Sequence, residues 1–156
     1  MLKTLVSYFS ATGVTKSVAH TIAHTLNSDI FEIEPVEKYT SEDLDWTNKQ
    51  SRSTKEMENK AFRPPIKNKV NNIDDYDTII LGFPVWWYTA PTIINTFIEE
   101  NNLNNKRIYI FVTSGSSTVE LSFEDLIKTY PNLSFISGKR FTQQITNEEI
   151  INWIKG

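Results

Sequence analysis

Two short apolar runs, at residues 79–81 and 108–112, constrain the fold of this chain most strongly. Neither run alternates with polar residues, so both are expected to form strands that are buried on both faces. Another apolar run lies at residues 5–9, and helical patterns separate the three runs. This alternation predicts a parallel sheet with helices on both sides, joined by right-handed crossovers, in an α/β three-layer sandwich.

Helix-period patterns lie between these predicted strands. Val14, Val18, Ile22 and Leu26 recur at four-residue steps, which predicts a helix directly after the first strand. Pro91 is suited to the start of a second helix because it carries no N–H group that the helix would need. The apolar residues that indicate two later helices are Ile93, Ile94, Phe97 and Ile98, and then Phe123, Leu126, Ile127 and Tyr130.

The last predicted helix has a clear start. Thr146 and Glu149 match a capping box, and Ile145 and Ile150 fit the hydrophobic staple that accompanies it. We expect its inward face to consist of three residues, Ile151, Trp153 and Ile154.

The remaining elements are less regular. Phe31 and Ile33 alternate with glutamates, as in a partly exposed strand, and a short strand is expected near residues 133–136. The segment 35–74 is polar and charged. A structureless loop of that length is unusual in a compact domain, so we expect a helix within residues 49–60.

Length and charge restrict the functional classes. We expect residues 1–156 to form one domain. The chain has 16 Lys and Arg against 19 Asp and Glu, a net charge of -3, which disfavours nucleic acid and membrane surfaces as partners. It contains no cysteine, so thiol catalysis and disulfides are excluded. The apolar stretch 79–88 is too short to span a bilayer, and no signal pattern is recognised, so a cytoplasmic location is expected.

The loop after the first strand has the composition of a phosphate site. It contains Ser10, Thr12, Gly13, Val14 and Thr15. Three hydroxyl groups can donate to phosphate oxygens, the glycine permits a close turn, and the following helix offers unpaired N–H groups at its positive end. An ordinary helix cap in a polar turn is the alternative interpretation, although a cap accounts for one hydroxyl residue and not for three.

Two further loops follow the central strands. Because the carboxyl ends of parallel strands share one edge of the sheet, all three loops are expected to meet there. The second loop supplies aromatic planes and the third a small polar turn, so a flat ring attached to a phosphate would suit the set. These loops consist of Pro84, Val85, Trp86, Trp87 and Tyr88, and of Thr113, Ser114, Gly115 and Ser116.

Each of these loops also has a purely structural interpretation. The two tryptophans could pack in the core, but two successive indoles cannot easily face the same core. The third loop could be an ordinary strand-to-helix turn, because Ser117 and Glu120 match a capping box.

Other sites find little support in the sequence. There is no GxGxxG after a strand and no GxxxxGK[ST], so neither a Rossmann dinucleotide site nor a P-loop is predicted. His20 and His24 have the spacing of a helical metal pair, but no third ligand accompanies them. We interpret them as exposed helix residues. No metal ligand and no catalytic side chain is predicted.

Taken together, the three loops resemble those of the flavodoxin family, and the resemblance covers nearly the whole chain. The middle segments also resemble a bacterial flavodoxin-like subgroup. The residues that carry this second similarity are Tyr39-Thr40, Leu44 with Trp46, Arg63-Pro64 and Tyr76-Asp77. The resemblance implies a five-stranded parallel sheet of order 2-1-3-4-5 that binds FMN at its switch point.

The resemblance also implies a role for each loop. The first would hold the FMN phosphate, the second would form one wall for the flavin ring, with Trp86 or Trp87 stacking, and the third would approach the ring's pyrimidine edge with backbone N–H groups. The redox chemistry would belong to the cofactor.

One position departs from the family pattern. Resembling sequences usually have glycine where Tyr88 stands, next to flavin N5, where a peptide can flip when a neutral semiquinone forms. Tyrosine adopts positive φ only at a cost, so we expect weak stabilisation of the one-electron state and better suitability for two-electron transfer. The mild net charge agrees with this expectation, because flavodoxin electron shuttles are commonly strongly acidic.

Three functions remain open at this point. The first is an FMN-binding electron carrier with a redox partner protein. The second is an NAD(P)H-dependent flavin or quinone reductase, in which Arg52 and Arg63 could serve a nicotinamide pocket, although solvated arginines are the simpler interpretation. The third is a non-redox FMN sensor or assembly protein. The sequence leaves the oligomeric state open.

Overall fold

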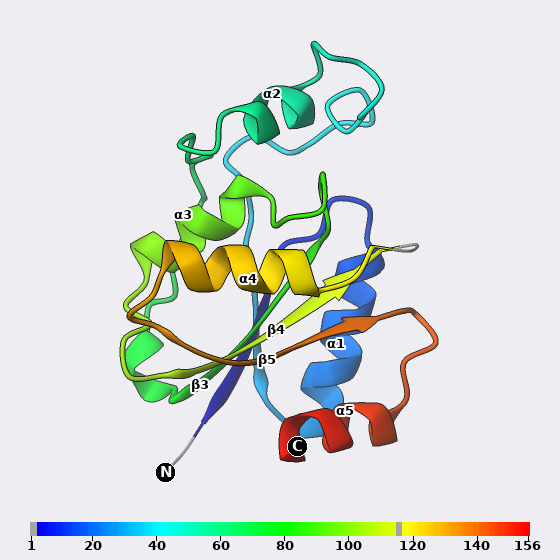
Figure 1. Cartoon of the computed structure of the whole chain (residues 1–156). Helices are drawn as coiled ribbons and strands as arrows, with labels where there is room; N and C mark the ends of the chain where they lie inside the picture. The colour runs from blue at the N-terminus through cyan, green and yellow to red at the C-terminus, as the bar shows by residue number, and fades with distance from the viewer. Residues whose placement is uncertain (1–2, 115–116) are drawn as a thin grey trace.

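The computed structural model describes residues 3–114 and 117–156 of the chain, which fold into alternating strands and helices (Figure 1). The strands are β1 (Thr4–Tyr8), β2 (Asp29–Glu32), β3 (Thr78–Pro84), β4 (Arg107–Thr113) and β5 (Ser134–Phe141). The helices are α1 (Val14–Leu26), α2 (Arg52–Glu58), α3 (Thr92–Glu100), α4 (Glu120–Thr129) and α5 (Asn147–Lys155), with a 3-10 turn at Ile73–Asp75. The helix expected within residues 49–60 is confirmed as α2.

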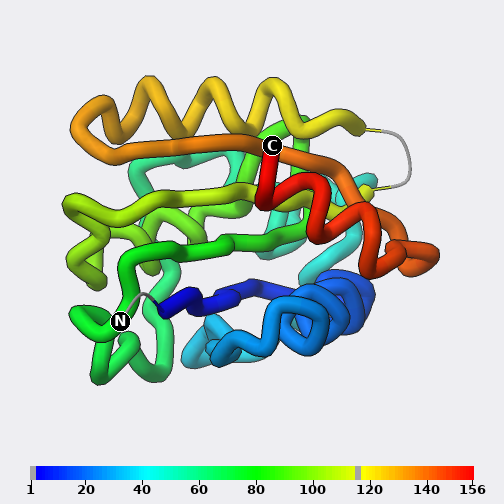
Figure 2. The backbone as a smooth tube through the Cα atoms, turned by 90° about the horizontal axis from the view of Figure 1, so that it is seen from below, coloured from blue at the N-terminus to red at the C-terminus, as the bar shows by residue number. Residues whose placement is uncertain are grey.

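The five strands form one parallel sheet in the order β2-β1-β3-β4-β5. Figure 2 shows β5, β4, β3 and β1 following one another across the molecule. The predicted α/β architecture and strand order are therefore confirmed. From β1 the chain first adds β2 on one side and then returns to add β3, β4 and β5 on the other side. The position between β1 and β3 is therefore the switch point, where open α/β sheets bind ligands.

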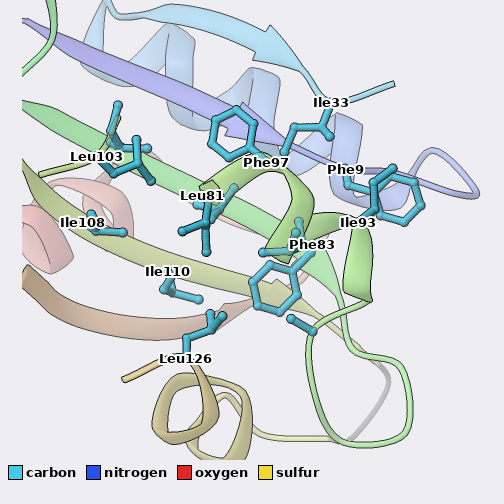
Figure 3. Close-up of a cluster of buried hydrophobic side chains, with 14 of the residues drawn as sticks. Phe9, Ile33, Leu81, Phe83, Ile93, Phe97, Leu103, Ile108, Ile110 and Leu126 are labelled. Atoms are coloured by element: carbon cyan, nitrogen blue, oxygen red, sulfur yellow. The ribbon is translucent and has the colours of Figure 1, made fainter. Parts of the chain in front are cut away.

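Helices cover both faces of the sheet, and each face has its own apolar cluster. On one face α1 and α5 pack against residues such as Val6 and Ile80. On the other face α3 and α4 contribute Phe97 and Leu126 to the apolar cluster drawn in Figure 3, which also contains Leu81 of β3. Because β3 and β4 are buried on both sides, their sequences read as the continuous apolar runs noted above.

Three details differ from the expectations. The strand expected near residues 133–136 continues to Phe141, as β5. Ile151 is 38% exposed, so the inward face of α5 consists of Ile150, Trp153 and Ile154 instead. Ile127 is likewise exposed on α4. In both helices the period was identified correctly, but one residue at the edge of the apolar stripe points to solvent.

The predicted cap of α5 is formed, because the Glu149 N–H group donates to Thr146 Oγ1 at 3.2 Å. We expect Thr146→Ala to lower the free energy of unfolding by about 1 kcal/mol, since one N–H group at the helix start loses its acceptor. Thermal denaturation would measure the loss. Thr129→Ala removes an exposed hydroxyl near the end of α4 and serves as the control; equal losses in the two variants would contradict the assigned cap.

Candidate functional site

The three loops identified in the sequence meet at the carboxyl edge of the sheet. Two backbone hydrogen bonds extend the strand pairing into them, from the Phe9 N–H to the Gly82 carbonyl at 3.0 Å and from the Val85 N–H to the Thr113 carbonyl at 3.2 Å. The hydroxyl groups of Thr15 and Thr113 lie 2.7 Å apart and are buried. The first and third loops are therefore joined directly.

The first loop turns at Gly13, which has φ +99° and ψ -11°. A Cβ placed on Gly13 would meet no atom within 4 Å, so the space beside the turn is open. Ser10 Oγ accepts a hydrogen bond from the Gly13 N–H at 3.1 Å and stabilises the turn. Gly13 is also the N-cap of α1, and no side chain caps this helix. The start of α1 is thus shaped by glycine and left without a side-chain acceptor.

The hydroxyl residues of this loop are not equivalent. Thr12 is exposed, while Ser10 and Thr15 are engaged in the contacts just described. The side chain of Thr15 contacts Thr113 and holds the two loops together. The prediction that all three hydroxyls donate to a phosphate therefore stays a prediction, and Thr12 is the member whose side chain faces solvent.

One cavity touches all three loops. It has a volume of about 450 Å³ and we call it the three-loop cavity. Such a volume lies within the range of small-molecule sites. Its lining residues are Thr12, Val14, Pro84, Val85, Trp86, Thr113, Ser114, Phe141, Thr142, Gln143 and Gln144.

The two adjacent tryptophans have different surroundings. Trp86 is partly buried and packs edge-to-face against Phe9, with ring centroids 5.7 Å apart, and against Tyr39, at 5.3 Å. Trp87 is 41% exposed. This confirms the expectation that the two indoles do not share one core. Of the two tryptophans, only Trp86 lines the three-loop cavity, so it is the indole that lies beside the phosphate loop.

The turn that carries these residues is unusual for its sequence. Trp86 and Thr89 exchange two backbone hydrogen bonds of 2.9 and 3.0 Å, and the two residues between them, Trp87 and Tyr88, have φ +49° and +68°. Two-residue turns with both central residues at positive φ are normally built from glycine and asparagine. Tyr88 thus adopts the backbone conformation that glycine would take easily, at a cost of about 1–2 kcal/mol.

We therefore expect Tyr88→Gly to raise the free energy of unfolding by about 0.5–1 kcal/mol, because relief at positive φ outweighs the added freedom of the unfolded chain. Tyr88→Ala is the matched control, since alanine loses the exposed ring but keeps the unfavourable φ. Chemical denaturation measures both. Equal stabilities of the glycine and alanine variants would contradict the assignment of strain to this residue.

The third loop is held by a residue of β5. Arg140 donates to the Ser114 carbonyl from Nε at 3.2 Å and from Nη2 at 3.0 Å. The Ser114 hydroxyl donates to the Ser117 carbonyl. Gly115 and Ser116, which were also predicted as site residues, lie outside the described residues. The alternative capping box does not form, because the N-cap of α4 is Val119 and no side chain caps it.

Sequence reasoning missed the contribution of β5. Arg140 lies in the polar last part of this strand, where no apolar run marks its continuation, and the segment 142–144 follows it. Because β5 is parallel to its neighbours, its carboxyl end lies at the same edge of the sheet as the other loops. A predicted strand that ended at Phe141, and not near residue 136, would have placed this fourth loop at the site.

A second cavity lies beside the first and shares Val85 and Trp86 with it. We call it the aromatic cavity, and its volume is about 640 Å³. No sequence pattern predicts this cavity, because Leu44, Trp46 and Ser53 belong to the long polar segment, whose path over the sheet edge is set by tertiary contacts. Its lining residues are Leu44, Trp46, Ser53, Val85, Trp86, Trp87, Tyr88 and Ser117.

Arg52 fixes part of this long segment. Its guanidinium lies 3.8 Å from the centroid of the Tyr39 ring, and its Nε donates to Glu56 Oε2 at 2.8 Å. The Tyr39 hydroxyl donates to the same carboxylate. Burial of the ring, followed by this hydrogen bond to Glu56, raises the pKa of Tyr39 well above its ordinary value. Arg52 thus supports the aromatic residues beside Trp86 from within the chain.

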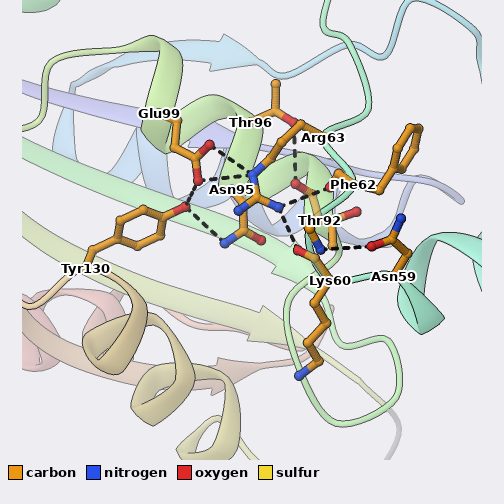
Figure 4. A network of polar contacts seen from close by, with 10 residues as sticks. Asn59, Lys60, Phe62, Arg63, Thr92, Asn95, Thr96, Glu99 and Tyr130 are labelled. Carbon is orange, nitrogen blue, oxygen red and sulfur yellow. Dashed lines mark hydrogen bonds and ion pairs between the residues drawn. The ribbon is translucent and has the colours of Figure 1, made fainter.

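Arg63 is engaged in a second network, shown in Figure 4. Its Nε donates to both carboxylate oxygens of Glu99, at 2.9 and 3.0 Å. Tyr130 donates to Glu99, and Asn95 donates to Tyr130 at 3.1 Å. Burial and the bond to Glu99 raise the pKa of Tyr130 to about 12. Both arginines therefore make internal contacts, and neither is the free solvated residue that was expected.

Other candidate sites are limited by what the structure describes. Within residues 3–114 and 117–156, no group of three or more His, Asp or Glu side chains could hold a metal ion. His20 and His24 are exposed on α1, as expected. No helix in that part of the chain is long and apolar enough to cross a membrane.

Comparison with known proteins identifies the family. A family model described as Flavodoxin matches residues 3–156. The chain is similar to the crystal structure of a suspected flavoprotein from Bacteroides eggerthii DSM 20697, with 44% identity, 98% and 96% of the two chains covered and a TM-score of 0.96. A suspected flavoprotein from Bacteroides uniformis ATCC 8492 matches with 42% identity, 99% of each chain covered and a TM-score of 0.94.

More distant structures share the fold. A flavoprotein from Lactobacillus acidophilus NCFM, solved in complex with FMN, has 22% identity, 99% of each chain covered and a TM-score of 0.78. A search among curated proteins finds no significant match to this chain. The family match over nearly the whole length, the sheet order and the three converging loops agree with one another, and the chain belongs to the flavodoxin family.

Proposed function

We propose that this protein binds FMN and acts as an electron carrier, with the FMN phosphate at the start of α1 and the flavin ring in the three-loop cavity. The observation that carries the proposal is the convergence of all three loops on that single cavity. The similar flavoprotein structure solved with FMN supports the same ligand.

The residues at the start of α1 fit a phosphate. Gly13 leaves open space where a side chain would project, and the first N–H groups of the helix have no side-chain cap. These N–H groups and the helix dipole favour a dianion. Thr12 adds an exposed hydroxyl that can donate to a phosphate oxygen. The chain therefore offers a phosphate site that needs no cationic side chain.

The rest of the cavity fits a flat ring. Val85 and Trp86 supply apolar surface, and Thr113 and Ser114 supply polar groups to the same cavity. Gly115 and Ser116 are proposed to contribute backbone N–H groups. FMN, when bound, supplies the redox chemistry, while these residues bind and orient it and exclude water from one face. No side chain is required as a nucleophile or acid–base group.

The phosphate contact can be tested with Thr12→Val, which removes the hydroxyl and keeps the shape of the side chain. We expect FMN affinity to fall about tenfold, as for a hydrogen bond to a charged group, while riboflavin affinity stays unchanged because riboflavin lacks the phosphate. Calorimetry measures both ligands. Thr21→Val, a half-buried position two turns further along α1 and outside the three-loop cavity, is the control. Parallel losses for FMN and riboflavin would exclude Thr12 from the phosphate site.

The aromatic cavity favours a second candidate function, a small reductase that takes hydride from NAD(P)H. The two functions differ in what reduces the bound flavin. With NADPH as the electron source under anaerobic conditions, the flavin of a carrier is bleached only when a separate reductase protein is also present. The flavin of a reductase is bleached by NADPH alone. We expect no bleaching by NADPH alone; rapid bleaching would assign the chain to the reductases.

A further inference from the structure

We propose that Arg140 is a positioning residue of the flavin site. From β5 it fixes the loop after β4 and places a positive charge beside the three-loop cavity, so that the site prefers reduced over oxidised FMN. The inference rests on the proposed function, because the preference concerns a bound flavin. Arg140 acts through Ser114, which lines the cavity.

The register of the sheet places Arg140 at the site. In the pairing of β4 with β5, Arg140 lies beside Val112, and Phe141 lies beside Thr113, the last residue of β4. Arg140 is therefore next to the carboxyl edge of the sheet, one residue before Phe141, which lines the three-loop cavity. Its side chain reaches past the end of β4 to Ser114.

Arg140 is bonded to Ser114 through two of its nitrogens. Nε and Nη2 donate to the Ser114 carbonyl at 3.2 and 3.0 Å, and Nε also lies 3.2 Å from Ser114 Oγ. The Ser114 hydroxyl in turn donates to the Ser117 carbonyl. Because Ser114 lines the three-loop cavity and Ser117 lines the aromatic cavity, these contacts fix a boundary of both.

The chemistry of arginine suits this role. The helix after the loop offers no comparable anchor, because the N-cap of α4 is Val119 and no side chain caps it. A guanidinium presents several donors in one rigid plane, so it can hold a carbonyl and a hydroxyl at once, whereas a lysine ammonium is a single point on a flexible stem. A loop that is held in place before FMN enters lowers the entropic cost of binding.

Arg140 also supplies a charge that the cavity lining lacks. The described residues that line the three-loop cavity are all uncharged, and Arg140 is partly buried and bonded directly to one of them. A flavin ring gains negative charge when it takes up electrons, and a partly buried cation is screened less than one in water. The guanidinium therefore stabilises reduced FMN more than oxidised FMN.

The test compares Arg140→Lys, which keeps the charge but not the planar fork, with Arg140→Gln, which loses both. Arg107→Gln is the control, because it removes the same charge at the opposite end of the neighbouring strand β4. Three quantities are measured on the whole chain. They are the hydrogen exchange of residues 113–119 without FMN, the affinity for oxidised FMN by calorimetry, and the midpoint potential of bound FMN against a reference dye under anaerobic conditions.

We expect hydrogen exchange of residues 113–119 to be at least about threefold faster in both Arg140 variants, because the loop loses part of its anchor. The affinity for oxidised FMN should fall about three- to tenfold in both. Only Arg140→Gln should lower the midpoint potential, by about 30 mV, which corresponds to an about tenfold weaker preference for reduced FMN. Arg107→Gln should leave all three quantities unchanged.

Two results would overturn the inference. Unchanged hydrogen exchange in Arg140→Gln would show that Arg140 does not hold the loop. The same potential in Arg140→Lys and Arg140→Gln, or an equal shift in Arg107→Gln, would show that the charge of Arg140 has no specific effect on the flavin.

Failure of the proposed function gives a different outcome. If the wild-type chain does not bind FMN, the proposed function fails and the preference for reduced FMN fails with it, while the exchange rates still decide whether Arg140 holds the loop. If the wild-type chain binds FMN and both Arg140 variants match it in all three quantities, only this inference fails.

Discussion

Gly82→Ala is expected to lower the free energy of unfolding by at least about 2 kcal/mol, the larger of the stability effects that this structure predicts. Gly82 lies in β3 at the centre of the sheet, and a Cβ built there would lie 1.9–2.4 Å from three ring atoms of Phe111. Phe111 is fully buried and packs against Phe141, so its ring has no space to move away. Denaturant titration of the wild type and the variant measures the difference.

Gly138→Ala is the matched control, because it adds the same methyl group to a strand of the same sheet, the edge strand β5. Its Cβ would come no closer than 3.0 Å to side-chain atoms of Phe123 and Val119, which are only partly buried and can shift. We expect a loss below about 1 kcal/mol. Similar losses in both variants would show that the cost arises from β-strand glycine in general and not from the ring of Phe111.

Trp86→Ala is expected to have the largest effect on FMN binding, a loss of about 10- to 100-fold in affinity, as for the removal of a stacked aromatic ring. Trp86 lines the three-loop cavity and is held edge-on by Phe9 and Tyr39. The same change should also lower the free energy of unfolding by about 2 kcal/mol, because a partly buried indole is lost. Fluorescence titration with FMN measures the affinity.

Trp86→Phe separates these two effects. It keeps an aromatic ring beside the cavity, so we expect most of the FMN affinity to remain. Trp87→Ala removes an exposed indole that does not line the three-loop cavity, and it should leave FMN affinity within about twofold of the wild type. A greater loss in Trp87→Ala than in Trp86→Ala would show that the wrong indole has been assigned to the flavin.

The sheet could be predicted from the sequence because its two central strands are almost entirely apolar. Strands β3 and β4 are buried on both faces, and few other structures accommodate uninterrupted apolar runs of that length between amphipathic helices. Once the strands were parallel, geometry alone placed the loops after β1, β3 and β4 on one edge. The position of the candidate site thus followed from topology and needed no side-chain contact.

The details of the site could not be predicted in the same way. No local rule assigns Trp87 and Tyr88 to a turn with positive φ, because such turns normally contain glycine or asparagine. That conformation is maintained by hydrogen bonds between Trp86 and Thr89, and the Tyr88 carbonyl accepts a further bond from the Ser122 hydroxyl at 3.4 Å. Tertiary contacts, and not the local sequence, therefore determine the conformation of this turn.

Long-range pairing explains the other omissions. The roles of Arg52 and Arg63 depend on Glu56, on the Tyr39 ring and on Glu99, and the last of these lies 36 residues from Arg63 in the sequence. A single sequence contains no signal for such partners. The length of β5 was underestimated for a different reason, since an edge strand with partly exposed residues lacks the apolar run that marks a buried strand.

Calorimetric titration of the ligand-free wild-type chain with FMN, and in parallel with riboflavin, tests the central claim most directly. If the loops after β1, β3 and β4 form one site for a phosphate and a flat ring, FMN binds one-to-one with a Kd below about 1 μM, and riboflavin binds at least about tenfold more weakly. No heat of binding with FMN, or equal affinity for the two ligands, would contradict the account.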